Sequence, residues 1–428
     1  MLKLALVTNR EDLLQNFFDF FEENINKIEK LTAQKMDITY ILNSSEDKKI
    51  VSIPEGKFNQ AEFIEDYNKI LTDSKVDIIL ELSRKQEPPD YLFQALKKDK
   101  TVITSNLKVI TENYLEIKKR EKKYGNRIFF AAAFSPLPIK TLIDNFYALD
   151  EPKELNAVLN ATTNYILAEM KKNKISMKET VEQAKELSYT EENTDLDLNG
   201  VDSLNKIILL ANLFYNTAIN PALINARGIK GITSYDLIYA AELGYKIKLI
   251  CALKKENEEL YLGVRPNLIP QDSFLASINE NSNGVEMLSD YNAKTTFTAE
   301  NCDQAPLNLL SLDLINAAKF INNKKRTDFR VEIKNFNVSD YYQKKFSSFY
   351  VRLQIEKDEE IIDKIKKIFS EKNLADLILH DNSTETPLLP VIILTKKIRE
   401  NDLEKLLEEV ENLEGVLTVN NIIAVKED

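Results

Sequence analysis

The sequence predicts an α/β protein in three successive parts, and three observations support this division. Short apolar runs alternate with helical patterns over residues 1–135, as in a doubly wound parallel sheet. Over 136–305 helical patterns are followed by long strand patterns separated by turn-like sequences, which is typical of a mixed α/β domain with an antiparallel-rich sheet. Residues 347–428 show the order βαββαβ of a ferredoxin-like unit. The charged and polar residues 323–346 are expected to form a linker.

Composition limits the class of protein. Hydrophobic residues make up 43% and charged residues 29%, as in soluble globular proteins. The net charge of −11, without a basic stripe, argues against nucleic acid and anionic membranes as partners. There is no apolar run long enough to cross a membrane and no secretory pattern at the start, so a cytoplasmic location is expected. Two cysteines and one histidine argue against a disulfide framework and provide too few ligands for a zinc or iron–sulfur site.

In the first part, the apolar run 2–7 is predicted to be a buried strand that leads directly into a helix. Apolar residues recur at helical spacing from Leu13 to Ile28. A further helix is expected at 91–98. The remaining predicted strands are 38–42, 76–82, 101–105 and 128–132. This alternation predicts a Rossmann-like sheet.

The second and third parts follow different orders of elements. In the second part, a strand at 154–159 precedes helices near 162–172, 176–187 and 202–216, and strands at 245–254, 258–265 and 285–298. An amphipathic helix over 306–322 is expected to return to the first domain. In the third part, the expected elements are strand 349–356, helix 359–371, strands 374–380 and 388–395, helix 400–413 and strand 416–425.

The stretch with the clearest chemical content is ELSYTEENTDLDLNGVDSLNKIILLANL, at 186–213. Its carboxylates precede or open an apolar helix, and Asp202 and Lys206 share one helical face because they are four residues apart. Taken alone, this spacing also fits a surface ion pair at a capped helix start, worth ~0.3–0.5 kcal/mol.

The same stretch closely resembles the homoserine dehydrogenase family. The family pattern, roughly Gly-Tyr-Ala-Glu-x-Asp-Pro-x-x-Asp-x-x-Gly-x-Asp-x-x-x-Lys, appears as SYTEENTDLDLNGVDSLNK at 188–206. NATTNYILAEM (160–170), RGIKGITSYDLIYAAELGYKIKLI (227–250) and VRPNLIPQDSFLASINENSNGV (264–285) are similar to further family segments. The tail resembles an ACT regulatory domain, so the resemblance covers nearly the whole chain in order.

This resemblance implies reversible NAD(P)H-dependent reduction of aspartate semialdehyde to homoserine, toward threonine and methionine. Hydride delivery to an aldehyde creates an alkoxide, which needs a proton donor and nearby positive charge. The resemblance implies that Lys206 supplies both, with Asp202 as its catalytic companion. It also implies that Glu191 and Asp202 hold the amino group and hydroxyl of the substrate, and that Thr162 and Asp197 lie in the same site.

The residues expected to contact the cofactor differ from the family pattern. The resemblance implies NADP or NAD as cofactor, and the residues that would meet it by position are Thr8, Asn9, Arg10 and Asn106. However, no glycine precedes Gly56, although glycines normally let a pyrophosphate approach the start of the first helix. Glu11 and Asp12 occupy the first helical turn, where they favour the helix and repel a dinucleotide. The family's ribose-binding acid falls near Asn43.

Other positions differ as well. Leu107 stands where the family has a second catalytic lysine, and a one-residue slip in an extended segment would turn Lys108 to the opposite face. The family's glycine pair before a proline reads SPLP at 135–138, and its late glycine-rich stretch reads ENCD at 300–303. Ala161 replaces a glycine beside the substrate positions.

Two hypotheses therefore stay open. The chain is either an active, divergent homoserine dehydrogenase or a catalytically silent paralogue. Such a pseudoenzyme would bind an amino acid or regulate a partner, such as an active enzyme or an aspartate kinase. The joint 357–360 of the tail lacks the glycine of effector loops, which favours a dimerising or docking module over a threonine sensor. The resemblance implies a small amino-acid-like substrate and a homodimer, or higher oligomer, through the central and ACT-like domains.

Overall fold

The computed structural model describes residues 1–9, 11–43, 60–82, 90–186, 194–323, 332–344, 346–380 and 387–426. The chain forms two compact units. The first contains Met1–Leu149, Leu209–Asn220 and Asn301–Asn335, and the second contains Asp150–Ile208, Pro221–Glu300 and Phe336–Asp428. No helix in the described ranges is long and apolar enough to cross a bilayer.

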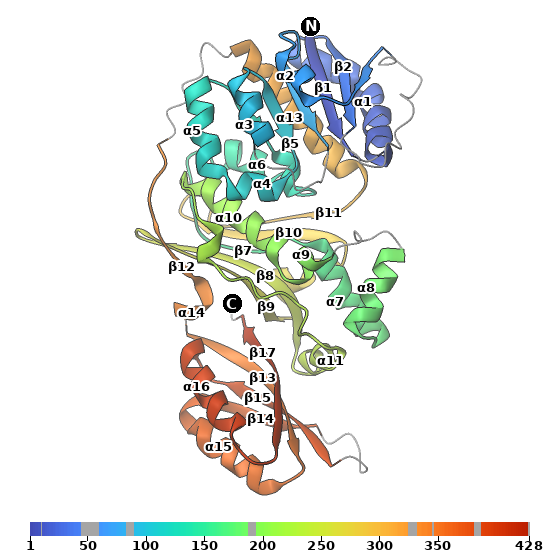
Figure 1. Ribbon diagram of the computed structural model, residues 1–428. Helices are drawn as coiled ribbons and strands as arrows, with labels where there is room; N and C mark the ends of the chain where they lie inside the picture. Colours follow the sequence, from blue (N-terminus) through green and yellow to red (C-terminus); the bar gives the residue numbers. More distant parts are fainter. Residues whose placement is uncertain are drawn as a thin grey trace. The chain divides into compact units, whose positions relative to one another are not determined.

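The first unit contains a parallel sheet of the doubly wound type (Figure 1). Its strands lie in the order β3-β2-β1-β4-β5-β6. They are β1 (Leu2–Thr8), β2 (Met36–Asn43), β3 (Glu62–Ile64), β4 (Ile78–Glu81), β5 (Thr101–Thr104) and β6 (Ile128–Phe129). Every pairing between neighbours is parallel, so the predicted sheet type is confirmed.

The strand expected at 128–132 is shorter than predicted. β6 ends at Phe129, and Ala131–Phe134 form a 3-10 helix instead. The backbone N–H of Ala132 donates to the buried carboxylate of Asp313 at 3.3 Å. This contact takes the chain away from the sheet ladder, and no local sequence pattern indicates it.

Helices cover the first sheet. They are α1 (Glu11–Thr32), α2 (Tyr67–Thr72), α3 (Asp90–Lys97), α4 (Leu107–Glu112), α5 (Tyr114–Tyr124), α6 (Ile139–Thr141) and α13 (Gln304–Asn323). The helix expected at 306–322 is α13, which lies beside α1 (Figure 1). Its Leu310 and Leu314 share one buried core with Leu4 of β1 and with Phe17 and Phe21 of α1. Apolar residues spaced three or four apart explain both buried helix faces.

The second unit is built on an antiparallel sheet that begins in the order β11-β10-β7-β8-β9. Its strands are β7 (Pro152–Val158), β8 (Tyr245–Glu256), β9 (Glu259–Pro270), β10 (Ser282–Ser289) and β11 (Lys294–Glu300). Helices of this unit are α7 (Ala161–Asn173), α8 (Met177–Glu186), α9 (Asp195–Leu198), α11 (Ser234–Glu242) and α12 (Phe274–Ser277). Helix α10 (Val201–Tyr215) begins in this unit and ends in the first.

The single strand expected at 285–298 is a hairpin of β10 and β11. The turn between them contains Ala293 at a φ of 52°. The carboxylate of Asp150 accepts hydrogen bonds from the backbone N–H groups of Tyr291 and Asn292, at 3.3 and 3.1 Å. A distant side chain therefore stabilises a turn that the apolar pattern did not reveal.

The C-terminal module, residues 346–425, continues the same sheet. It contains β13 (Phe346–Glu356), α15 (Glu359–Asn373), β14 (Leu374–Leu379), β15 (Leu388–Thr395), β16 (Ile398–Arg399), α16 (Glu400–Glu411) and β17 (Val416–Val425). The strand order β17-β13-β15-β14 is that of a ferredoxin-like sheet. Strand β17 also pairs in parallel with β9, where Ala424 lies opposite Asn267.

The segment expected as a linker is partly structured. β12 (Asn337–Asp340) pairs in parallel with β9, and α14 (Tyr341–Lys344) follows directly. Tyr342 is 3% exposed and belongs to the core of the C-terminal module. The polar composition of residues 323–346 did not indicate this strand, because β12 forms through its pairing with β9, which is distant in the sequence.

Candidate active site

Asn160 lies at the centre of the candidate site, at the start of α7. Its side-chain oxygen caps the helix by accepting from the N–H of Thr163 at 2.8 Å. Its amide nitrogen donates to Asp197 Oδ1 at 2.5 Å and to Asp202 Oδ2 at 2.9 Å. One buried amide therefore holds two carboxylates that come from α9 and α10.

Lys206 completes this cluster one turn along α10. Its Nζ lies 2.9 Å from Asp202 Oδ2 and donates to the carbonyl of Leu159 at 2.8 Å. The Lys206 side chain is 13% exposed and that of Asp202 is 27% exposed. An ammonium has three donors, so one N–H remains for a ligand among the contacts of the described residues. The pair is therefore partly buried and restricted by residues 159–160, unlike an ion pair on an exposed helix face.

Asp197 and Asp202 lie on either side of a sharp turn between α9 and α10. Gly200 has a φ of +77°, a conformation that L-residues rarely adopt. This turn lets α10 restart directly after α9, so that Asp197 and Asp202 both reach Asn160. In the sequence, Asp197 lies 37 residues after Asn160 and Asp202 lies 42 residues after it.

Cys251 lies in the core beneath the site. It is fully buried in β8, and its Sγ lies 3.7 Å from the carbonyl oxygen of Ser203. Burial raises the pKa of this thiol to about 12. Cys251 therefore remains protonated at neutral pH and is no nucleophile.

The other predicted substrate residues have different outcomes. Thr162 lies in the first turn of α7, half-buried, two residues after Asn160. Glu191 lies outside the described residues. Asn160 itself was missed as a site residue, although it opens the NATTNY motif. The sequence did contain a signal for this role, because asparagine is a preferred N-cap residue and its amide N–H groups can donate to carboxylates.

The cofactor positions lie in the first unit, at the carboxyl ends of its strands. Thr8 is fully buried at the end of β1, and the next residue, Asn9, is half-buried. Asn9 Oδ1 is buried without a hydrogen-bond partner among the described residues. Arg10 lies outside the described residues, and Glu11 is exposed at the first position of α1.

Asn106 caps α4 rather than pointing freely from the sheet. Its side chain accepts from the N–H of Val109 at 3.3 Å, and its own N–H donates to Thr104 Oγ1 at 3.0 Å. The expectation of an extended segment here is wrong, since α4 begins at Leu107. Leu107 is buried, whereas Lys108 pairs with Glu112 at 3.9 Å on the outside of this helix.

A buried carboxylate, Glu81, lies at the end of β4. It is 1% exposed and accepts hydrogen bonds from the hydroxyl groups of Tyr91, at 2.6 Å, and Thr104. Ligands of doubly wound sheets bind at this strand edge. A dinucleotide fits the strand order and the unpartnered acceptor of Asn9. It does not fit the first turn of α1, where Glu11 stands in place of a vacant, positively polarised helix start.

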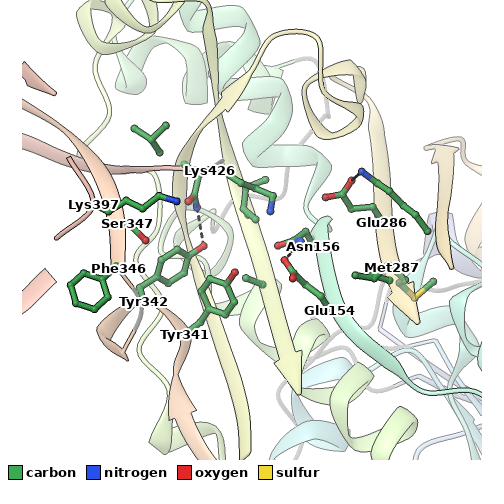
Figure 2. Close-up of a pocket in the computed structure, with 16 residues that line it drawn as sticks. Glu154, Asn156, Glu286, Met287, Tyr341, Tyr342, Phe346, Ser347, Lys397 and Lys426 are labelled. Carbon is green, nitrogen blue, oxygen red and sulfur yellow. Dashed lines mark hydrogen bonds and ion pairs between the residues drawn. The ribbon is translucent and has the colours of Figure 1, made fainter. Parts of the chain in front are cut away.

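A cavity of about 420 Å³ also lies in the second unit (Figure 2). Its lining includes Glu154 and Asn156 of β7, Tyr341 of α14 and Lys397 of the C-terminal module. None of the predicted site residues lines it. In the described ranges, no group of three or more His, Cys, Asp or Glu residues is arranged to hold a metal ion.

Comparisons with known proteins match two separate regions of the chain, one in the central part and one in the N-terminal part. Residues 138–306 match the family model described as homoserine dehydrogenase, and residues 22–131 match that of the homoserine dehydrogenase NAD binding domain. The second match supports NAD or NADP as the expected cofactor.

Curated relatives and solved structures extend the match along the chain. A homoserine dehydrogenase of Neisseria gonorrhoeae is 24% identical over 405 residues, covering 92% of each protein. One of Methanocaldococcus jannaschii is 33% identical over 188 residues, covering 43% of this chain and 54% of the relative. A homoserine dehydrogenase structure from Thiobacillus denitrificans has a TM-score of 0.86 at 19% identity, covering 100% of this chain and 98% of that one. The structure from S. aureus has a TM-score of 0.74 at 25% identity, covering 100% and 99%. The chain belongs to the homoserine dehydrogenase family.

Proposed function

We propose that this protein catalyses the NAD(P)-dependent interconversion of aspartate semialdehyde and homoserine. The observation that carries the proposal is the Lys206 ammonium, enclosed and held by Asp202 and the Leu159 carbonyl. Asn160 keeps this arrangement in place by binding Asp202 and Asp197 together. The second unit alone thus supplies a cation and two carboxylates suited to a small amino-acid-like substrate.

Lys206 would act at the substrate oxygen. When bound, the nicotinamide supplies the hydride that forms the new C–H bond at the aldehyde carbon. As the C=O π electrons move to oxygen, an alkoxide develops and takes a proton from the Lys206 ammonium. Among the described residues, Asn160 and Lys206 both contact Oδ2 of Asp202, so its Oδ1 would accept a hydrogen bond from the product hydroxyl.

The remaining carboxylates would bind the other end of the substrate. Asp197, fixed by Asn160, would offer negative charge to the substrate amino group, together with Glu191, as the family resemblance implies. Thr162 remains a predicted substrate residue. The homoserine product would serve threonine and methionine formation.

The test is loss of NADPH absorbance with aspartate semialdehyde, repeated with NADH. We expect turnover by the wild type and a loss of at least about 100-fold in Lys206→Met, since general acid catalysis contributes on the order of 10²–10⁴-fold. Lys172→Met is the matched control, because Lys172 is 74% exposed and pairs only loosely with Glu169. Absence of turnover at high enzyme concentration with either cofactor would refute the proposal.

One observation favours a second function, that of a silent paralogue that binds an amino acid. The first turn of α1 presents Glu11 where a phosphate would bind. Calorimetric titration separates the two functions: homoserine binding without binding of NADPH or NADH supports the silent paralogue. Binding of either dinucleotide at micromolar concentration supports the enzyme.

We also propose a homodimer formed through the central and C-terminal domains, with the latter acting as an ACT-like docking module. The family resemblance and the ferredoxin-like strand order support this proposal. Sedimentation velocity measures the assembly directly. A species with the mass of one chain across the accessible concentrations would contradict it.

A further inference from the structure

A segment of the second unit, residues 226–236, contacts the turn that carries the site carboxylates. The N–H of Ile229 donates to the carbonyl of Leu198 at 2.8 Å. At Gly228 the backbones approach so closely that a Cβ would lie 1.8 Å from that same oxygen and 2.5 Å from Asn199 Cα. The α9–α10 turn therefore rests directly on the backbone of this segment, which we call the bracing segment.

The other side of the bracing segment is attached to the C-terminal module. Arg227 Nη1 lies 2.7 Å from Glu400 Oε1 on α16, and Arg227 Nη2 lies 3.7 Å from Glu404. Glu400 is 2% exposed and also accepts from Arg265 of β9. A buried carboxylate is costly unless it is paired, and Glu400 is paired with the buried Arg265 and with the half-exposed Arg227, which links the bracing segment to α16.

A second anchor lies at the far end of the bracing segment. Asp236 is fully buried and accepts from Arg352 Nε of β13 at 2.7 Å. Asn421 of β17 donates to the carbonyl of Gly231 at 3.0 Å. The C-terminal module thus holds the segment at Arg227, Gly231 and Asp236, while Gly228 and Ile229 support the α9–α10 turn.

We infer that Arg227 is a positioning residue through which the C-terminal module sets the place of Asp197 and Asp202. The backbone path is short, because Arg227 precedes Gly228 and Ile229, the two residues that touch the turn. The effect on substrate affinity rests on the proposed function, whereas the effect on the turn itself does not. Released from Glu400, the segment would loosen the turn and misplace both carboxylates.

The experiment uses Arg227→Met in the full chain, with two readouts. The first is hydrogen exchange at the backbone amides of residues 197–202, which needs no activity and should quicken several-fold. The second is steady-state kinetics, in which the KM for homoserine should rise about three- to tenfold while kcat stays within about twofold, as for lost substrate positioning. Arg227 is 48% exposed, so the variant is expected to fold.

Matched variants separate this role from general packing. Arg227→Lys keeps the charge and should restore most of the affinity. Lys405→Met removes a cation from α16 that is 74% exposed and lies 3.9 Å from Asp402, and should change neither readout. In a cycle of Arg227→Met and Glu400→Gln, the double variant should be no worse than the single Glu400→Gln variant.

Unchanged exchange at 197–202 in Arg227→Met would overturn the inference, as would strictly additive effects in the cycle. A wild type without turnover would refute the proposed function alone, since the exchange measurement still decides the role of Arg227. If Glu400→Gln fails to fold, Arg227→Met and Arg227→Lys together remain decisive.

Discussion

The Lys206 ammonium lies 2.9 Å from the carboxylate of Asp202, one turn earlier on the same helix. A pair at this spacing on an exposed helix would be worth little. Here the Leu159 carbonyl and the Asn160 amide lie against the pair, so its geometry is restricted by neighbours from another segment. The same two side chains therefore form a partly buried pair of fixed geometry instead of a surface contact.

Asn160→Ser separates helix capping from the bridging of the carboxylates. Serine is as good an N-cap as asparagine, so the free energy of unfolding should change by less than about 1 kcal/mol. The amide donor to Asp197 and Asp202 is lost, so these like charges repel. We expect a rise of about tenfold or more in the homoserine dissociation constant, measured by calorimetry. Unchanged affinity would show that the bridge plays no part in binding.

Asp313 should make the stability of the protein depend on pH. Burial raises its pKa from 3.8 to about 7, so the folded state binds this proton more tightly than the unfolded state does. Its contribution is fully present below pH 4 and is lost as the pH rises to about 7. Asp313→Asn should therefore be more stable than the wild type at pH 8, by on the order of 2–4 kcal/mol.

Urea unfolding at pH 5 and pH 8 measures this difference. The advantage of Asp313→Asn should shrink toward the lower pH, because the wild-type carboxyl is then increasingly protonated. Asp19→Asn is a suitable control, since Asp19 is an exposed acid of the same unit, on α1, that accepts a hydrogen bond from Gln15. A wild-type advantage at pH 8 would contradict the prediction.

The two cysteines should differ sharply toward a thiol reagent. Cys302 is exposed, whereas Cys251 is buried with a pKa of about 12. At pH 8 a disulfide reagent that forms a coloured thiolate should therefore titrate one thiol per native chain and two in denaturant. Cys302→Ser should abolish the native reaction. Rapid native reaction of that variant would mean that the β8 core opens readily.

Glu11→Gln should strengthen dinucleotide binding. Removing a negative charge from the first turn of α1 leaves the helix N-terminus more favourable for a phosphate, by ~0.3–1 kcal/mol. The dissociation constant for NADPH should therefore fall about two- to fivefold. Glu23→Gln, at an exposed site about three turns further along the same helix, should leave the dissociation constant unchanged. Equal effects of both variants would indicate net charge alone rather than the helix start.

Local pattern accounts for much of this protein. The alternation of apolar runs and helical spacing predicted the parallel sheet and the βαββαβ order, because burial of one face leaves a period in the chain. The spacing of Asp202 and Lys206 predicted a shared face for the same reason. The resemblance of 188–206 to one enzyme family, to which the chain belongs, predicted where the substrate would bind.

Tertiary structure decided the features that depend on distant partners. Asn160 joins Asp197 and Asp202 across 37 and 42 residues, a relation without a period in the sequence. The hairpin after β10 needs the Asp150 carboxylate, and α4 begins at Leu107 where an extended segment was expected. The attachment of Arg227 to Glu400 likewise exists only once the C-terminal module is folded against β9. Charges interact through space, so the interaction energy of a charged side chain depends on which groups the fold brings within a few ångströms of it.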